Sequence, residues 1–234
     1  MDAYRGVAVR VPATGQAAAA VLVLHGGYEH GIARPGRLNP PARRMHPFIR
    51  AIAGAARDRD LVVAEARYRH RGWNGERADT ARDAARALEE LAALTGGAPV
   101  VMVGHSMGAR AALRTAGTPT VAGVVALAAW CPPDEPVAHL GGARLVFVHA
   151  RGDRITSPAA SLAMAGRARA AGAQVARYEF PRGDHAMLRG AARWHRLTAR
   201  AVCGLLGFAP LPSGAAQSFA LPAASADGLT LPPG

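Results

Sequence analysis

Short runs of apolar residues recur along the chain, and each run is bounded by polar or turn-forming residues. Most runs are continuous rather than alternating, which is typical of strands that are covered on both faces. A weaker, alternating stretch at residues 4–11 predicts an edge strand. Six further strands are predicted at residues 17–24, 61–66, 99–103, 121–129, 144–150 and 174–180.

Segments with helical periodicity lie between these runs. The clearest covers residues 77–95, where alanine and leucine residues recur on one helical face and most charged residues lie elsewhere. Ser157 followed by Pro158 marks a helix start, because serine caps the first amides and proline fits the first turn. The alternation of strands and helices predicts an α/β fold with a mostly parallel central sheet. Four more helices are predicted at residues 47–58, 107–116, 158–171 and 187–206.

A change in composition near the C-terminus sets the expected domain boundary. From Ala209 onward the sequence is rich in Pro, Ala, Gly and Ser and shows no period. A length of 234 residues favours one large domain over two. We therefore expect residues 1–208 to form a single domain and residues 209–234 to form a flexible C-terminal tail.

The positive charge does not by itself indicate a nucleic-acid or membrane partner. The net charge of +12 comes from 28 arginines, and the sequence contains no lysine. The arginines are scattered and form no basic run, so a GC-rich coding bias explains them and neither nucleic acid nor a membrane is expected as a partner. No apolar run approaches the ~20 residues that span a bilayer, and no signal-peptide pattern is evident. With two isolated cysteines, Cys131 and Cys203, the expected location is the cytoplasm.

Polar and glycine-rich residues follow five of the predicted strands, where an open α/β sheet carries its functional site. One of these segments is Gly104-His105-Ser106-Met107-Gly108, which fits the G-x-S-x-G pattern between a strand and a helix. Glycines two residues either side of the serine allow the strand and the helix to pass closely, and the strained turn exposes the hydroxyl. This context favours Ser106 as a nucleophile over an ordinary glycine-rich turn.

A serine hydroxyl needs a base to accept its proton, and the base needs a carboxylate to orient it. His185 follows the last predicted strand and is the expected base. Asp153 follows the preceding strand and is the expected acid, with Asp184 and Asp134 as alternatives. The chain order of serine, aspartate and histidine matches one of the known triad architectures.

Two backbone amides are expected to bind the oxyanion. One belongs to Met107, and the other to Gly27 or Tyr28 in the glycine-rich loop after the first central strand. His25 is interpreted as a structural residue that braces this loop, and His149, inside a predicted strand, as a core histidine. The histidines and carboxylates show no metal-ligand spacing, and the triad needs no cofactor, so neither a metal nor a cofactor is expected.

Together these motifs make the chain resemble the α/β-hydrolase fold superfamily, and residues 17–207 resemble its small, cap-free bacterial serine hydrolases. The resemblance implies a carboxylesterase or thioesterase that works through a Ser-His-Asp triad and an acyl-enzyme intermediate on a small-molecule substrate. The chain departs from the family pattern in two ways. Only one strand is predicted before the strand that leads into His25, so the sheet should have seven or fewer strands rather than eight. No large lid is expected, because only residues 130–143 separate two successive predicted strands. The motifs that carry the resemblance are HGG at 25–27, GHSMG at 104–108, GDRITSP at 152–158 and GDHAML at 183–188.

The sequence leaves the substrate, the choice between ester and thioester, and the oligomeric state undetermined. His105, Trp73 and Trp130 are candidate substrate-binding residues, although a core or surface role fits the two tryptophans nearly as well. The same motifs also fit an acyltransferase or a biosynthetic thioesterase. A non-catalytic binding protein on this fold is disfavoured, because no triad position is missing.

Cationic residues at the same edge of the predicted sheet would favour an anionic substrate. They follow the predicted strand at residues 61–66, and coding bias explains them as well. These residues are Arg67, Arg69 and Arg71.

Overall fold

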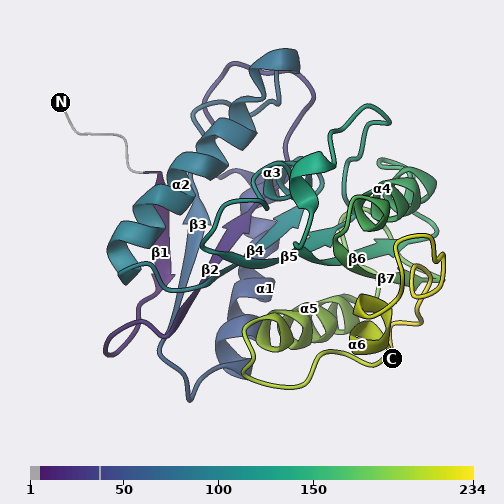
Figure 1. Cartoon of the computed structure of the whole chain (residues 1–234). Coiled ribbons are helices and arrows are strands. Elements are labelled where there is room, and N and C mark those ends of the chain that lie inside the picture. Colours follow the sequence, from purple (N-terminus) through teal and green to yellow (C-terminus); the bar gives the residue numbers. More distant parts are fainter. Residues whose placement is uncertain (1–5, 37) are drawn as a thin grey trace.

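A seven-stranded sheet forms the centre of the computed structural model, which describes residues 6–36 and 38–234 (Figure 1). The order across the sheet is β1-β3-β2-β4-β5-β6-β7, and neighbours run parallel except for β1 and β3. All predicted strands are present, although residues 4 and 5 of the expected edge strand lie outside the described residues. The strands are β1 Val7–Val11, β2 Ala19–Leu24, β3 Leu61–Ala66, β4 Val100–His105, β5 Val121–Leu127, β6 Arg144–Ala150 and β7 Gln174–Phe180.

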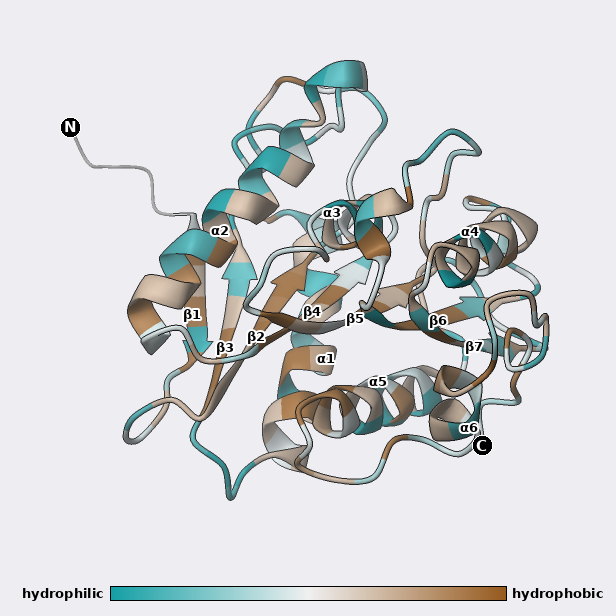
Figure 2. Cartoon of the chain, in the orientation of Figure 1, coloured by the Kyte–Doolittle hydropathy of each residue, from teal (hydrophilic) through white to brown (hydrophobic). Residues whose placement is uncertain are grey.

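Successive side chains of each central strand enter two different cores, because side chains alternate across a sheet. In β2, Leu22 and Leu24 belong to the core under α2, α3 and α4, whereas Val21 and Val23 belong to the core under α1, α5 and α6. In Figure 2 the central strands are mostly hydrophobic, and hydrophilic residues gather on the helices and loops. The helices are α1 Pro40–Ala55, α2 Asp79–Thr95, α3 Met107–Arg114, α4 Pro158–Ala170, α5 Ala191–Leu205 and α6 Ala215–Phe219.

Helix α1 begins at Pro40, upstream of the residue 47 that the periodicity predicts. Pro40 and Pro41 occupy the first helical positions, where no amide donor is required. Pro47 lies inside the helix and lacks the amide that would bond to the carbonyl one turn earlier. Because an interior proline usually ends a helix, the sequence pattern does not extend the helix upstream of this residue.

The segment after α5 differs from the flexible tail that the composition predicts. It contains α6, and Leu231 pairs with Tyr178 of β7 in a parallel bridge. The guanidinium group of the buried Arg169 donates hydrogen bonds to the carbonyls of Ser225 and Asp227, at 2.7 and 2.6 Å. These long-range bonds hold a segment without sequence periodicity against the sheet.

The connections leave the carboxyl-terminal edge of the sheet uncovered by any additional domain. Only residues 128–143 join β5 to β6, and they contain one short 3₁₀ turn, η2, at Ala138–Leu140. A second 3₁₀ turn, η1, lies at Gly75–Arg77 before α2. None of the helices in the described ranges is long and apolar enough to cross a membrane.

Candidate active site

The predicted catalytic residues follow the carboxyl ends of four strands. Ser106 follows β4 directly, Asp153 follows β6, His185 lies in the loop after β7, and Gly27 lies in the loop after β2. Because these strands are parallel within one sheet, their carboxyl ends lie along the same edge.

Ser106 occupies a strained turn between β4 and α3. Its backbone angles are φ 56° and ψ −116°, a conformation that a residue with a side chain rarely adopts. A Cβ on Gly104 would lie 2.5 Å from Ala109 Cα, and a Cβ on Gly108 would lie 2.4 Å from the carbonyl oxygen of Leu24. The two glycines therefore allow α3 to approach β4 and β2 closely enough to make this turn.

Gly108→Ala is expected to lower the free energy of unfolding by about 2–3 kcal/mol, because the added methyl group would collide with backbone that cannot rotate away. The matched control is Gly54→Ala in α1, where a Cβ would meet no atom within 4 Å. That change should instead stabilise the protein by about 0.4–1 kcal/mol. Urea unfolding followed by circular dichroism measures both variants, and equal stabilities would contradict the steric argument.

His185 and Asp153 form a direct side-chain contact. His185 Nδ1 lies 2.8 Å from Asp153 Oδ2, and the carboxylate is fully buried. Because a carboxylate only accepts hydrogen bonds, Nδ1 carries the proton and Nε2 is left free to accept one. The other carboxylate oxygen, Oδ1, accepts from the amides of Ile155 and Thr156, at 2.8 and 3.1 Å.

These hydrogen bonds control the protonation of the buried acid. Burial alone would raise the pKa of Asp153, but the bonds from two histidines and from the Ile155 amide outweigh this effect. They hold the pKa of the Asp153 carboxyl well below its usual range, so the group is charged at neutral pH.

His149 is a neighbour of the predicted acid that the sequence analysis does not identify. Its Nε2 lies 3.1 Å from Asp153 Oδ2, the same oxygen that His185 contacts. His149 Nδ1 is buried and has no hydrogen-bond partner among the described residues. His149 is thus a buried residue of β6, as interpreted, but only one of its ring nitrogens is satisfied: Nε2 contacts Asp153 and Nδ1 has no partner within the described chain. Only the spacing of four residues between His149 and Asp153 gave a signal, and such spacing is common by chance.

Thr156 completes the surroundings of the acid. Its Oγ1 lies 3.0 Å from both Asp153 Oδ2 and the carbonyl oxygen of Ala128, and 3.2 Å from His185 Nδ1. A hydroxyl has one proton to donate, so it donates to one of these oxygens at a time. The side chain packs the His185–Asp153 pair from the side of β5.

His105 is buried and contacts the loop that carries His185. It is 1% exposed, and its Nε2 lies 2.9 Å from the backbone carbonyl of His185. Burial, followed by the proximity of His185, lowers the pKa of His105 to about 3, so the ring is neutral and donates from Nε2. The structure therefore suggests that His105 supports the His185 loop rather than binding substrate.

No hydrogen bond joins Ser106 Oγ to His185 among the residues that the structure describes. In unliganded enzymes the bond between nucleophile and base is often long.

The backbone amides of Gly27 and Tyr28 are the two alternatives for the second oxyanion donor, and only one of them is free of a hydrogen bond to the described residues. The amide of Tyr28 donates to the carbonyl of Arg71 at 3.1 Å and is therefore already used. In the described chain the amides of Gly27 and Met107 have no hydrogen-bond acceptor. A Cβ on Gly27 would lie 2.3 Å from Met107 Cε, so the two residues are in close contact. The Tyr28 amide is therefore occupied, and the amides of Gly27 and Met107 stay as the predicted oxyanion donors.

Trp73 and Trp130 stack against an arginine at the edge of a cavity. The Arg110 guanidinium carbon lies 3.9 Å from the centre of the Trp73 ring and 4.4 Å from that of Trp130. Trp73 is buried, and both tryptophans line a cavity of about 550 Å³ that also contains Asp134. Asp134, one alternative acid, is thus in a different cavity from His185.

The remaining candidates have structural contacts. Asp184, the other alternative acid, accepts from the amides of Leu188 and Arg189, at 3.1 and 2.8 Å. His25 is buried and lies 3.3 Å from Asn39 through Nε2. Within the described ranges no three His, Cys, Asp or Glu side chains gather in a way that could hold a metal ion.

Comparison with known proteins agrees with this architecture. Residues 21–232 match the family described as the alpha/beta hydrolase family. A putative alpha/beta hydrolase from Agrobacterium tumefaciens superposes with a TM-score of 0.67 at 14% identity, covering 90% of this chain and 98% of its own. A serine hydrolase without a lid from Xanthomonas campestris gives 0.59 at 19% identity, covering 88% and 90%. The esterase domain of a Rhodothermus marinus protein gives 0.57 at 16% identity, covering 82% and 89%.

A comparison with curated protein sequences finds none that matches this chain. The family match nevertheless spans most of the sequence, and the sheet order, the turn at Ser106 and the lidless edge agree with it. The chain therefore belongs to the alpha/beta hydrolase family, and it is a hydrolase built on that fold.

Proposed function

We propose that this hydrolase cleaves a carboxylic ester or thioester through a Ser-His-Asp triad and an acyl-enzyme intermediate. One observation carries the proposal: the His185–Asp153 hydrogen bond of 2.8 Å forms at the same sheet edge as the strained turn that presents Ser106. The buried, charged carboxylate fixes the histidine tautomer in which Nε2 can accept a proton. Without that pair, a serine hydroxyl would be a weak nucleophile.

The reaction follows from the free atoms at this edge. His185 Nε2 accepts the proton of Ser106 as Oγ forms a bond to the carbonyl carbon. The amides of Gly27 and Met107 donate to the oxygen that becomes negatively charged. When the tetrahedral intermediate collapses, the bond to the alcohol or thiol breaks and His185 returns the proton to that leaving group. Water then attacks the acyl carbon, with His185 again as the base, and releases Ser106.

A fluorophosphonate probe tests the nucleophile directly. The wild-type protein is expected to be labelled at Ser106, and Ser106→Ala is expected to lose the label. Ser213→Ala is the matched control, because Ser213 is an exposed serine in the segment after α5 and should leave labelling unchanged. In-gel fluorescence with mass-spectrometric mapping of the labelled peptide measures the result. Absence of label on the wild-type protein would overturn the proposal.

A further inference from the structure

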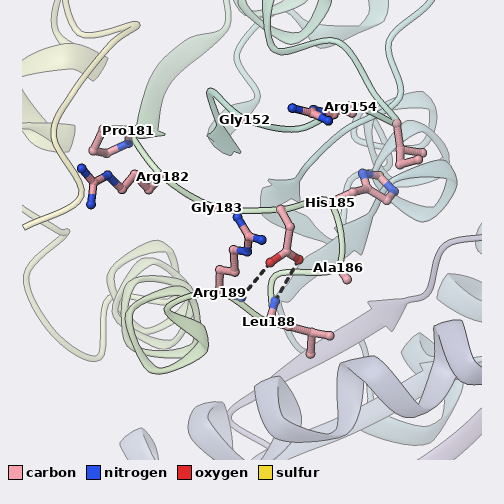
Figure 3. Close-up of a pocket in the computed structure, with 11 residues that line it drawn as sticks. Gly152, Arg154, Pro181, Arg182, Gly183, His185, Ala186, Leu188 and Arg189 are labelled. Atoms are coloured by element: carbon pink, nitrogen blue, oxygen red, sulfur yellow. Dashed lines mark hydrogen bonds between the residues drawn. The ribbon is translucent and has the colours of Figure 1, made fainter.

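A cavity next to His185 is lined by arginine and aliphatic side chains that have no role in the proposed triad chemistry. The loops after β6 and β7 enclose about 980 Å³, and His185 forms part of the lining (Figure 3). This volume lies near the upper end of the range for small-molecule sites. A substrate group that lies beside His185 would therefore have room in this cavity.

The cavity carries three arginines without carboxylate partners. Arg154, Arg182 and Arg189 are exposed, and none forms an ion pair among the described residues. By contrast, Arg151 in the same loop after β6 bonds to Glu179 at 2.8 Å. Three exposed cations that line one cavity attract an anion more strongly than any one of them does.

The acidic groups near the cavity do not neutralise these arginines. Asp184 is the acidic residue in the lining, and its carboxylate accepts hydrogen bonds from the backbone amides of Leu188 and Arg189, drawn as dashed lines in Figure 3. Asp153 lies below the cavity, fully buried and paired with His185. The lining therefore keeps an excess of positive charge.

Aliphatic surface accompanies this charge. Ile155 and Leu188, which line the cavity, are 75% and 70% exposed. An aliphatic chain that covered them would remove apolar area from water and be stabilised by the hydrophobic effect. The described residues expose few other large hydrophobic side chains, and most of these also follow carboxyl ends of strands. The exposed set is Val9, Tyr28, Ile32, Leu38, Leu94, Ile155 and Leu188.

We propose that this cavity binds an anionic group of the substrate, so that the preferred ester or thioester carries an aliphatic segment and a carboxylate or phosphate. The inference rests on the proposed function, because it places the anion on a substrate that Ser106 attacks. The anionic group belongs either to the acyl part or to the leaving group, and both have the same recognition chemistry: guanidinium groups that pair with oxyanions.

Two matched pairs of substrates test the proposal and separate these two positions. Monomethyl adipate differs from methyl hexanoate only in that a carboxylate replaces the terminal methyl group of the acyl chain. S-butyryl-4′-phosphopantetheine differs from S-butyrylpantetheine only by a phosphate on the leaving group. We expect the anionic member of at least one pair to have a kcat/KM about tenfold higher at low salt. The preference should shrink in 0.5 M NaCl, because salt screens exposed charges.

The triple variant Arg154→Gln, Arg182→Gln, Arg189→Gln is expected to abolish the preference while leaving the kcat/KM of the neutral substrate within about twofold. Exposed ion pairs are weak, so each arginine should account for about a twofold effect, mainly in KM, and the three together for about the tenfold preference. The matched control replaces three exposed arginines distant from the cavity. These are Arg57 and Arg59 before β3, and Arg200 in the second half of α5.

The outcomes separate the two proposals. Hydrolysis of all four substrates without an anionic preference, or a preference that survives in the triple variant, would overturn the anion site and leave the esterase function standing. If the control variant loses the anionic preference to the same extent, the preference comes from the net charge of the protein, and this result would also overturn the site. If no substrate is hydrolysed and the fluorophosphonate probe does not label Ser106, the proposed function itself fails.

Discussion

Asp153→Asn is expected to lower kcat for ester hydrolysis by about 10⁴-fold while leaving the protein folded. The amides of Ile155 and Thr156 donate to Oδ1, so the asparagine side chain should keep its oxygen on that side. Its NH₂ group would then face His185 Nδ1. To accept that hydrogen bond, the imidazole must move its proton to Nε2, where it can no longer take the proton of Ser106.

Asp184→Asn is the matched control for this substitution. Asp184 lies in the same loop as His185 but its carboxylate contacts backbone amides only. Loss of one such hydrogen bond should change kcat/KM by no more than about tenfold. Steady-state kinetics with a p-nitrophenyl ester, together with circular dichroism as a folding control, distinguishes the two acids. If Asp184→Asn loses activity while Asp153→Asn retains it, Asp184 rather than Asp153 is the acid of the triad.

Arg169→Ala is expected to lower the free energy of unfolding by about 3–5 kcal/mol. Arg169 is 2% exposed, and its guanidinium group donates to the carbonyls of Val175, Ser225 and Asp227. Its loss removes these charge-assisted hydrogen bonds together and leaves a cavity where the buried side chain stood. Urea unfolding monitored by circular dichroism measures the change. Arg169→Lys, which keeps the charge but not the planar set of donors, should lose about half as much.

Arg82→Ala serves as the control for this measurement, because Arg82 is exposed on α2 and its removal should change stability by less than about 0.5 kcal/mol. If Arg169→Ala unfolds at the same urea concentration as Arg82→Ala, the bonds from Arg169 to the C-terminal segment do not stabilise the fold.

The sequence pattern locates the strands well, because each central strand is a short apolar run that ends at a polar or glycine residue. The same pattern places Ser106, Asp153 and His185 at one edge, since parallel strands bring their carboxyl ends together. These predictions depend on local periodicity and on chain order. Both are properties of the sequence itself.

Features that depend on contacts between distant segments could not be predicted in this way. The availability of the Tyr28 amide depends on the carbonyl of Arg71, which a different loop positions. The contact of His149 with Asp153 is local, but it depends on how the chain turns after β6, which the apolar pattern of the strand does not specify. The C-terminal segment has no period because its order comes from Arg169 and Arg177, which bind its carbonyl groups.

The pairing of the C-terminal segment with β7 has a consequence for the behaviour of the protein at high concentration. β7 is the last strand of the sheet, and an open strand edge is a template for association with other chains. Arg177 and Glu179 donate their amides to Gly228 and Leu231, so the segment occupies that edge. Pro232 and Pro233 follow and have no amide to continue the ladder. The fold thus protects the β7 edge of its sheet against edge-to-edge aggregation.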